Sequence, residues 1–136
     1  MLEQLTLAYY EKGYNCAEAM IRGADEAYGL RIGHDDIKLF SGYGLGMGCM
    51  GTCGLATVGL AVYSRLAVGA RAHDTEGFVQ ACHRYMDGFA AQVGSTGCAQ
   101  LRQMRYDRTA KCRQSVVLAC RYTEEFLVQA GLVKSE

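Results

Sequence analysis

The chain has 136 residues, half of them hydrophobic, and a formal net charge of zero. A chain of this length can bury a core without a disulfide or a metal, so we expect one domain over residues 1–136. The neutral charge balance gives no basis for binding nucleic acid or an anionic membrane. The first residues lack the pattern of a secretory signal, and the most apolar segment, residues 54–63, is too short to span a bilayer. These features predict a cytoplasmic protein without nucleic-acid or membrane partners.

The elements in chain order follow helical periodicity. Apolar residues spaced for one helix face predict an amphipathic helix over residues 2–11. Asn15 followed by Glu18 has the form of a capping box and predicts a second helix, which Gly29 ends. Asp35 and Asp36 precede a brief helical turn, and a glycine-rich run over residues 42–48 follows it.

The second half continues the same pattern. Thr52 is the predicted N-cap of a buried helix over residues 53–68, and Asp74 or Thr75 is the predicted start of the next helix. Residues 94–97 break the chain before a short helix, and Thr109 is the predicted cap of the last long helix. No segment has the period of a strand. We therefore expect an all-α fold, a compact single-domain bundle of about five to six helices with a Gly-rich loop.

Seven cysteines, seventeen glycines and no proline are the unusual features of the composition. In a reducing compartment, cysteines are more often metal ligands, redox thiols or core residues than disulfides, and an odd number cannot all pair. Cys82 and Cys120 lie on apolar helix stripes, which favours core roles for both. Of the other five, four lie in the first turns of predicted helices, namely Cys16, Cys53, Cys98 and Cys112. At helix N-termini thiol pKa values fall to roughly 3.5–7.5 in known examples, so these positions predict reactive thiols or ligands.

The glycine-rich loop supplies a second group of candidate residues. Cys49 forms a C-x3-C pair with Cys53, which is close enough to share a ligand. Gly48, Gly51 and Gly54 flank these cysteines, and their backbone N–H groups are candidates for hydrogen bonds to the sulfurs of a bound cofactor. Whether Cys49 joins the site stays open.

The cysteine pattern carries a resemblance. The stretch "GYNCAEAM" around Cys16, the "TCG" at residues 52–54, and the later Cys98 and Cys112 resemble a family of redox-active proteins. That family is named for a Cys…Cys-Gly-Ala-x-x-Gly…Cys…Cys pattern, and the likeness extends from residue 13 to about 120. Leu55 stands where the pattern has alanine, and the motif's glycine comes late, at residue 59. The resemblance implies a redox role for the four cysteines within a helical fold.

Two mechanisms compete for the four cysteines. Four thiolates are the right number for an iron–sulfur cluster, used in electron transfer or sensing, or for an all-cysteine zinc site. In a metal-free dithiol mechanism, Cys16 attacks and Cys53 resolves the mixed disulfide. A helical binding or assembly module with incidental cysteines is a third alternative, so a thiol- or metal-dependent oxidoreductase remains an open assignment. Covalent haem is excluded because the chain has no C-x-x-C-H motif.

Other motifs give weaker indications. Basic residues run from Arg102 to Arg113, which indicates a solvated face or a docking surface for an acidic redox partner. We expect Tyr14 and Tyr43 to line the cysteine site. Gly59, which would let a second helix approach closely, makes a homodimer a further prediction.

Overall fold

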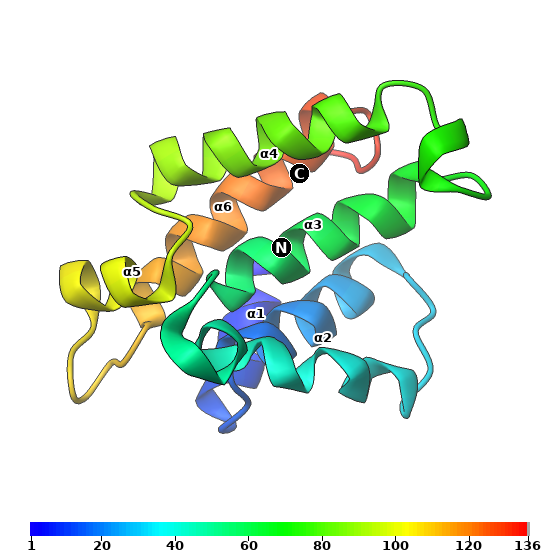
Figure 1. Ribbon diagram of the computed structural model, residues 1–136. Helices are drawn as coiled ribbons and strands as arrows, with labels where there is room; N and C mark the ends of the chain where they lie inside the picture. Colours follow the sequence, from blue (N-terminus) through cyan, green and yellow to red (C-terminus); the bar gives the residue numbers. More distant parts are fainter. Residues whose placement is uncertain (136) are drawn as a thin grey trace.

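The computed structural model of the protein describes residues 1–135, so residue 136 of the predicted domain lies outside the described residues. The α-helices are α1 (Leu2–Glu11), α2 (Cys16–Tyr28), α3 (Gly54–Ala67), α4 (Phe78–Val93), α5 (Cys98–Arg105) and α6 (Arg113–Gln129) (Figure 1). Short helical segments, η1 (Asp36–Tyr43), η2 (Gly46–Met50) and η3 (Ala72–Asp74), connect them. Residues 1–135 contain no strand, which confirms the all-α prediction. Within the same range, no helix has the length and apolar character needed to cross a bilayer.

Helix α2 begins and ends as predicted. The Asn15 side chain accepts a hydrogen bond from the N–H of Glu18 at 2.8 Å, and the Glu18 carboxylate accepts one from the N–H of Asn15 at 2.9 Å. This reciprocal capping box satisfies two backbone donors that would otherwise lack partners at the helix start. Gly29 ends the helix in the left-handed conformation at φ 61°. The cap therefore fixes where Cys16, the first helical residue, enters the fold.

Helix α3 lies in the middle of the bundle, with α2 on one side and α4 and α6 on the other (Figure 1). Gly59 is buried where α3 meets α4 and α6, and a Cβ atom there would collide with the Tyr85 hydroxyl and the Thr123 side chain. Tyr85 and Thr123 share a buried hydrogen bond of 2.8 Å. The helices that approach closely at Gly59 are therefore α4 and α6 of the same chain. Because Gly59 is covered within the chain, it no longer supports the predicted homodimer, which stays a prediction.

Three helix starts differ from the sequence prediction. Thr52 is not the cap of α3, because it pairs with Gly97 in an isolated bridge and Cys53 takes the cap position. The helix predicted from Asp74 or Thr75 begins at Phe78 instead, after Gly77 turns the chain at φ 72°.

The predicted cap of the last helix, Thr109, is also wrong. Helix α6 begins at Arg113, and Cys112 occupies the cap position. The carboxylate of Asp107 accepts hydrogen bonds from the N–H groups of Thr109 and Ala110 at 2.7 and 2.6 Å. Thr109 therefore belongs to a tight turn that Asp107 closes, rather than to a helix cap.

Candidate redox site

The four cysteines at helix starts line one pocket of about 370 Å³. Cys16 and Cys98 are the first residues of α2 and α5, and Cys53 and Cys112 occupy the cap positions of α3 and α6. The predicted placement at helix N-termini is thus confirmed for each of them. Four separate segments of the chain contribute one thiol apiece, and the fold brings the helix starts together.

A short stretch of backbone pairing joins the starts of α3 and α5. The N–H of Cys53 donates to the carbonyl of Thr96 at 2.7 Å, and the N–H of Cys98 donates to the carbonyl of Gly51 at 2.7 Å. These two bonds flank the bridge between Thr52 and Gly97. Cys53 and Cys98 are therefore held on adjacent backbone segments, although 45 positions separate them in the sequence.

Side chains from the N-terminal hairpin complete the pocket. The hydroxyl of Tyr10, on α1, accepts a hydrogen bond from the N–H of Cys112 at 3.0 Å. The Asn15 side chain donates to the carbonyl of Ser41 at 3.1 Å, which ties the start of α2 to η1. Tyr10 thus fixes the start of α6 against α1, and Asn15 fixes Cys16 against the segment that leads into the glycine-rich loop.

The glycine-rich loop has a left-handed backbone and packs against Cys98. Leu45, Met47 and Met50 have positive φ values of 53°, 61° and 54°, which are uncommon for residues with side chains. A Cβ atom on Gly46 would lie 2.7 Å from the Cβ of Cys98, so only glycine fits at this contact. The loop forms one wall of the site through this close approach.

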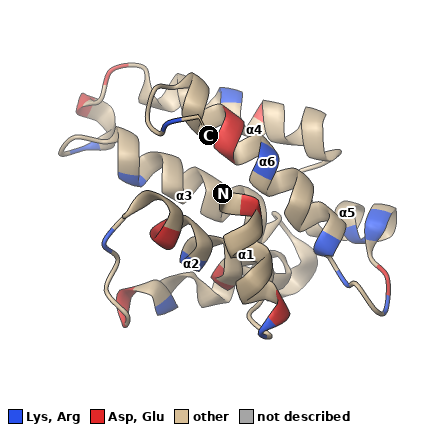
Figure 2. Cartoon of the chain, turned by 180° about the vertical axis from the view of Figure 1, so that it is seen from behind, with Lys and Arg blue, Asp and Glu red and all other residues tan. Residues whose placement is uncertain are grey.

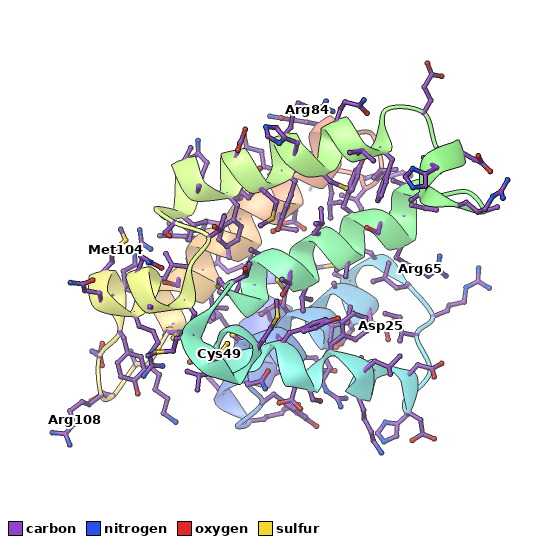
Figure 3. The ribbon with its side chains drawn as sticks, viewed as in Figure 1. Asp25, Cys49, Arg65, Arg84, Met104 and Arg108 are labelled. Carbon is purple, nitrogen blue, oxygen red and sulfur yellow. The ribbon has the colours of Figure 1, made fainter. Side chains whose placement is uncertain are left out.

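The predicted cofactor-contacting residues of this loop divide into two groups. Gly54 lines the pocket, whereas Gly48, Cys49 and Gly51 are not among the residues that line it. Cys49 is exposed on the loop before α3, and its thiol lies 3.5 Å from the carbonyl of Gly46 (Figure 3).

Of the two tyrosines expected at the site, one lines the pocket and the other does not. Tyr14 lines the pocket, whereas Tyr43 lies outside the lining, with 38% of its surface exposed. The carbonyl of Tyr43 instead approaches Gly54, where a Cβ atom would come within 2.5 Å of it.

Burial sets the protonation of the thiols. Burial raises the pKa of Cys16 to about 12, and the neighbouring Cys53 and Cys112 thiols add to the shift. Burial likewise raises the pKa of Cys53 to about 11, although hydrogen bonds from the N–H groups of Leu55 and Ala56 oppose it. The pKa of Cys98 is also raised by burial. The expectation of lowered pKa values is therefore wrong for these three thiols, because desolvation outweighs the helix N-termini.

The thiols surround the pocket without forming a preassembled metal centre. All seven cysteines are free, and residues 1–135 contain no group of three or more His, Cys, Asp or Glu side chains close enough to hold an ion. The four cysteines therefore share one pocket but do not form a single coordination sphere within the described residues.

The two remaining cysteines lie in the helices where they were expected. Cys120 is fully buried in the core, and Cys82 is half-buried and packs against it. Sequence reasoning gave no role at the pocket to Tyr10, because its contribution is a hydrogen bond across 102 positions. Arg102 and Lys111 also line the pocket. Their positions four residues after Cys98 and directly before Cys112 are a signal that could have placed them there.

The comparisons with known proteins identify a family. No curated protein and no solved structure matches the chain. The family model described as "Putative redox-active protein (C_GCAxxG_C_C)" matches residues 14–126, a range that includes the four pocket cysteines. The chain therefore belongs to this redox-active protein family.

Proposed function

We propose that this chain is a small cytoplasmic redox protein in which Cys16, Cys53, Cys98 and Cys112 act as one site. In this proposal the four thiols hold an iron–sulfur cluster or another thiophilic metal centre for electron transfer or sensing. The observation that carries the proposal is that these cysteines, each from a different helix start, line a single pocket.

The donor set and its surroundings suit an anionic metal–thiolate centre. Four cysteine thiolates are the usual ligand number for [2Fe–2S] and [4Fe–4S] clusters. Helix N-termini direct partial positive charge at the thiolates and offset the negative charge of such a centre. The raised pKa values of Cys16 and Cys53 mean that binding must displace their protons. We therefore expect metal affinity to rise with pH, since each ligand must lose its proton.

A metal-free dithiol is the second candidate, and the free thiols around an open pocket favour it. Its attacking group must be a thiolate, which the raised pKa of Cys16 disfavours near neutral pH. Cys112 lines the same pocket, is half-buried like Cys16, and directly follows Lys111, so it is the better candidate for the attacking thiol.

Purification without oxygen followed by analysis of iron, zinc, acid-labile sulfide and the visible spectrum tests the proposal. We expect iron and sulfide in stoichiometric amounts, with a charge-transfer band that Cys53→Ser abolishes. Cys82→Ser is the matched control, because Cys82 is half-buried on α4 and does not line the pocket; this variant should keep both metal and band.

Other outcomes discriminate between the candidates. Stoichiometric zinc without colour would assign a structural or regulatory centre to the same thiols. No metal, together with oxidation of two pocket thiols to a disulfide, would assign the dithiol mechanism. Iron that survives Cys53→Ser but is lost in Cys82→Ser would contradict the four-cysteine site.

A further inference from the structure

Basic residues gather at the pocket although the chain as a whole is neutral. Residues 98–113 contain five basic side chains and one acidic one, Asp107. Figure 2 shows this charge on α5 and on the loop that follows it. Two of the five basic residues, Arg102 and Lys111, line the cysteine pocket itself.

Arg102 is held one helical turn after Cys98 on α5. Its guanidinium lies 3.9 Å from the centre of the Tyr106 ring, a contact that fixes the side chain while leaving its N–H donors available. The positive charge also acts on the Cys98 thiol, where it opposes the increase in pKa that burial causes. Arg102 therefore stands close enough to the pocket to act on a bound anion.

Lys111 is positioned by a tight turn. Asp107 and Lys111 exchange backbone hydrogen bonds of 2.8 and 3.3 Å, and Lys111 has a left-handed backbone at φ 55°. The carboxylate of Asp107 is occupied by two N–H groups of the same turn. A strained backbone is maintained only when its surroundings enforce it, and such positions are frequent at functional sites. Here the residue with the strained backbone is Lys111, which directly precedes Cys112.

The two cations have no ion-pair partner within residues 1–135. Arg113, by contrast, pairs with Glu11 at 2.6 Å. Glu18 is the acidic residue that lines the pocket, and its carboxylate accepts hydrogen bonds from the Asn15 N–H and the Ser41 hydroxyl. The pocket thus combines free thiols with two cations that lack an ion-pair partner among the described residues and with one carboxylate, Glu18, whose oxygens are already engaged in hydrogen bonds.

We propose that this pocket takes a small anionic disulfide as substrate, with Arg102 and Lys111 binding its carboxylates while the cysteines react with its sulfurs. The inference rests on the metal-free dithiol form of the proposed function, in which the pocket cysteines are free thiols that react directly. A volume of about 370 Å³ lies in the range of small-molecule sites.

The reaction consists of two exchanges. The Cys112 thiolate attacks one sulfur of the disulfide, which breaks the S–S bond, forms a mixed disulfide and releases the first thiolate product. A second pocket cysteine then attacks the Cys112 sulfur and releases the second product. Two protein thiols lose two electrons and two protons, and the substrate gains both as two thiols. Cys112 reacts first because it is half-buried and directly follows Lys111, whereas Cys53 and Cys98 are buried. Cys16 is also half-buried, but its pKa is raised to about 12, so it is rarely a thiolate near neutral pH.

Three symmetrical disulfides that differ in charge test the proposal with the reduced full-length chain. These are oxidised glutathione, which is anionic, bis(2-hydroxyethyl) disulfide, which is neutral, and cystamine, which is cationic. The measurement is the rate at which protein thiols disappear, divided by the rate of the same disulfide with 2-mercaptoethanol. We expect the normalised rate of oxidised glutathione to exceed that of the neutral disulfide by about tenfold at low ionic strength, with cystamine the slowest. About 1 M salt should remove the difference.

Charge-neutralising variants then locate the effect. Arg102→Gln and Lys111→Gln should each lower the preference for oxidised glutathione by about threefold, so that together they account for the tenfold effect, with little change toward the neutral disulfide. Arg84→Gln is the matched control, because Arg84 is exposed on α4, far from the loop that carries Arg108 (Figure 3). Circular dichroism confirms that each variant is folded.

The outcomes separate the inference from the proposed function. Equal normalised rates for the three disulfides at the pocket cysteines overturn the anionic preference and leave the four-cysteine site intact. A preference that survives in both variants overturns the roles of Arg102 and Lys111. Thiol loss that peptide mapping assigns to Cys49 or Cys82, with the pocket cysteines unmodified, overturns the site and the inference together.

Discussion

Cys16 offers the sharpest test of the electrostatic reasoning, because burial raises the pKa of its thiol to about 12. At pH 8 a thiol with this pKa is a thiolate in about one molecule in 10⁴, whereas an unfolded cysteine with a pKa of about 8.5 is about one quarter ionised. We therefore predict that Cys16 alkylates about 2,000-fold more slowly in the folded chain than in the unfolded one. For Cys53, whose pKa is raised to about 11, the same arithmetic predicts about 200-fold.

Pulsed alkylation with iodoacetamide measures both values. The reduced, metal-free chain is labelled between pH 7 and pH 11, and peptide mass spectrometry gives the rate at each cysteine. The same residue in urea-unfolded chain is the reference. The pH dependence separates ionisation from access, because limited access lowers the rate equally at every pH. We expect the Cys16 rate to rise about tenfold per pH unit up to pH 10 without reaching a plateau.

A plateau for Cys16 below pH 9 in folded protein would refute this reasoning. It would mean that the start of α2, together with the N–H of Leu45 that hydrogen-bonds the thiol, outweighs burial. The dithiol mechanism with Cys16 as the attacking thiol would then regain its support. Slow labelling with the predicted slope would instead leave Cys16 as a metal ligand or a late-reacting thiol.

Three further predictions concern stability and are read from urea unfolding followed by circular dichroism. Gly59→Ala should destabilise the fold by about 1–3 kcal/mol, because the added Cβ would displace the Tyr85 hydroxyl. The control is Gly69→Ala, whose Cβ would meet nothing within 4 Å and should change stability by less than about 0.5 kcal/mol. Equal effects of the two variants would contradict the packing argument. Asn15→Ala should cost about 1 kcal/mol through loss of the capping box, and an unchanged urea midpoint would show that Cys16 is positioned by other contacts. Burial raises the pKa of Cys120 to about 12, so the unfolded chain loses this proton first and stability should fall by about 1.4 kcal/mol per unit as pH rises from about 9 toward 12. Cys120→Ala should remove that part of the slope, and a wild-type slope in the variant would contradict the assignment.

Local signals made the helices predictable, and non-local pairing explains where the prediction failed. The capping box at Asn15 and Glu18 is complete within four residues, so the sequence alone locates the start of α2. Thr52 is an equally good cap by residue type, but its backbone pairs with Gly97, 45 positions away, and the cap moves to Cys53. At Thr109, the carboxylate of Asp107 closes a turn before a helix can begin.

The site was predictable only in part. Spacing suggested that four cysteines sit at helix starts, which needs local information alone. Their shared pocket depends on long-range contacts, such as the Tyr10 hydroxyl that binds the N–H of Cys112. The thiol pKa values could not be read from spacing either, because helix N-termini lower them while burial raises them. Only the fold shows that burial is the larger effect at Cys16 and Cys53.

The glycines after Cys53 act on the packing of α3, and one of them, Gly54, also lines the cysteine pocket. At Gly54 a Cβ would come within 2.5 Å of the Tyr43 carbonyl, and at Gly59 it would collide with the Tyr85 hydroxyl. Both positions lie on α3, and each lets another part of the chain approach the helix closely. Leu55, which stands where the family pattern has alanine, is buried in the core. The motif therefore acts mainly through packing: it seats α3 deeply enough that Cys53, at the start of the helix, reaches the pocket shared with the other three thiols.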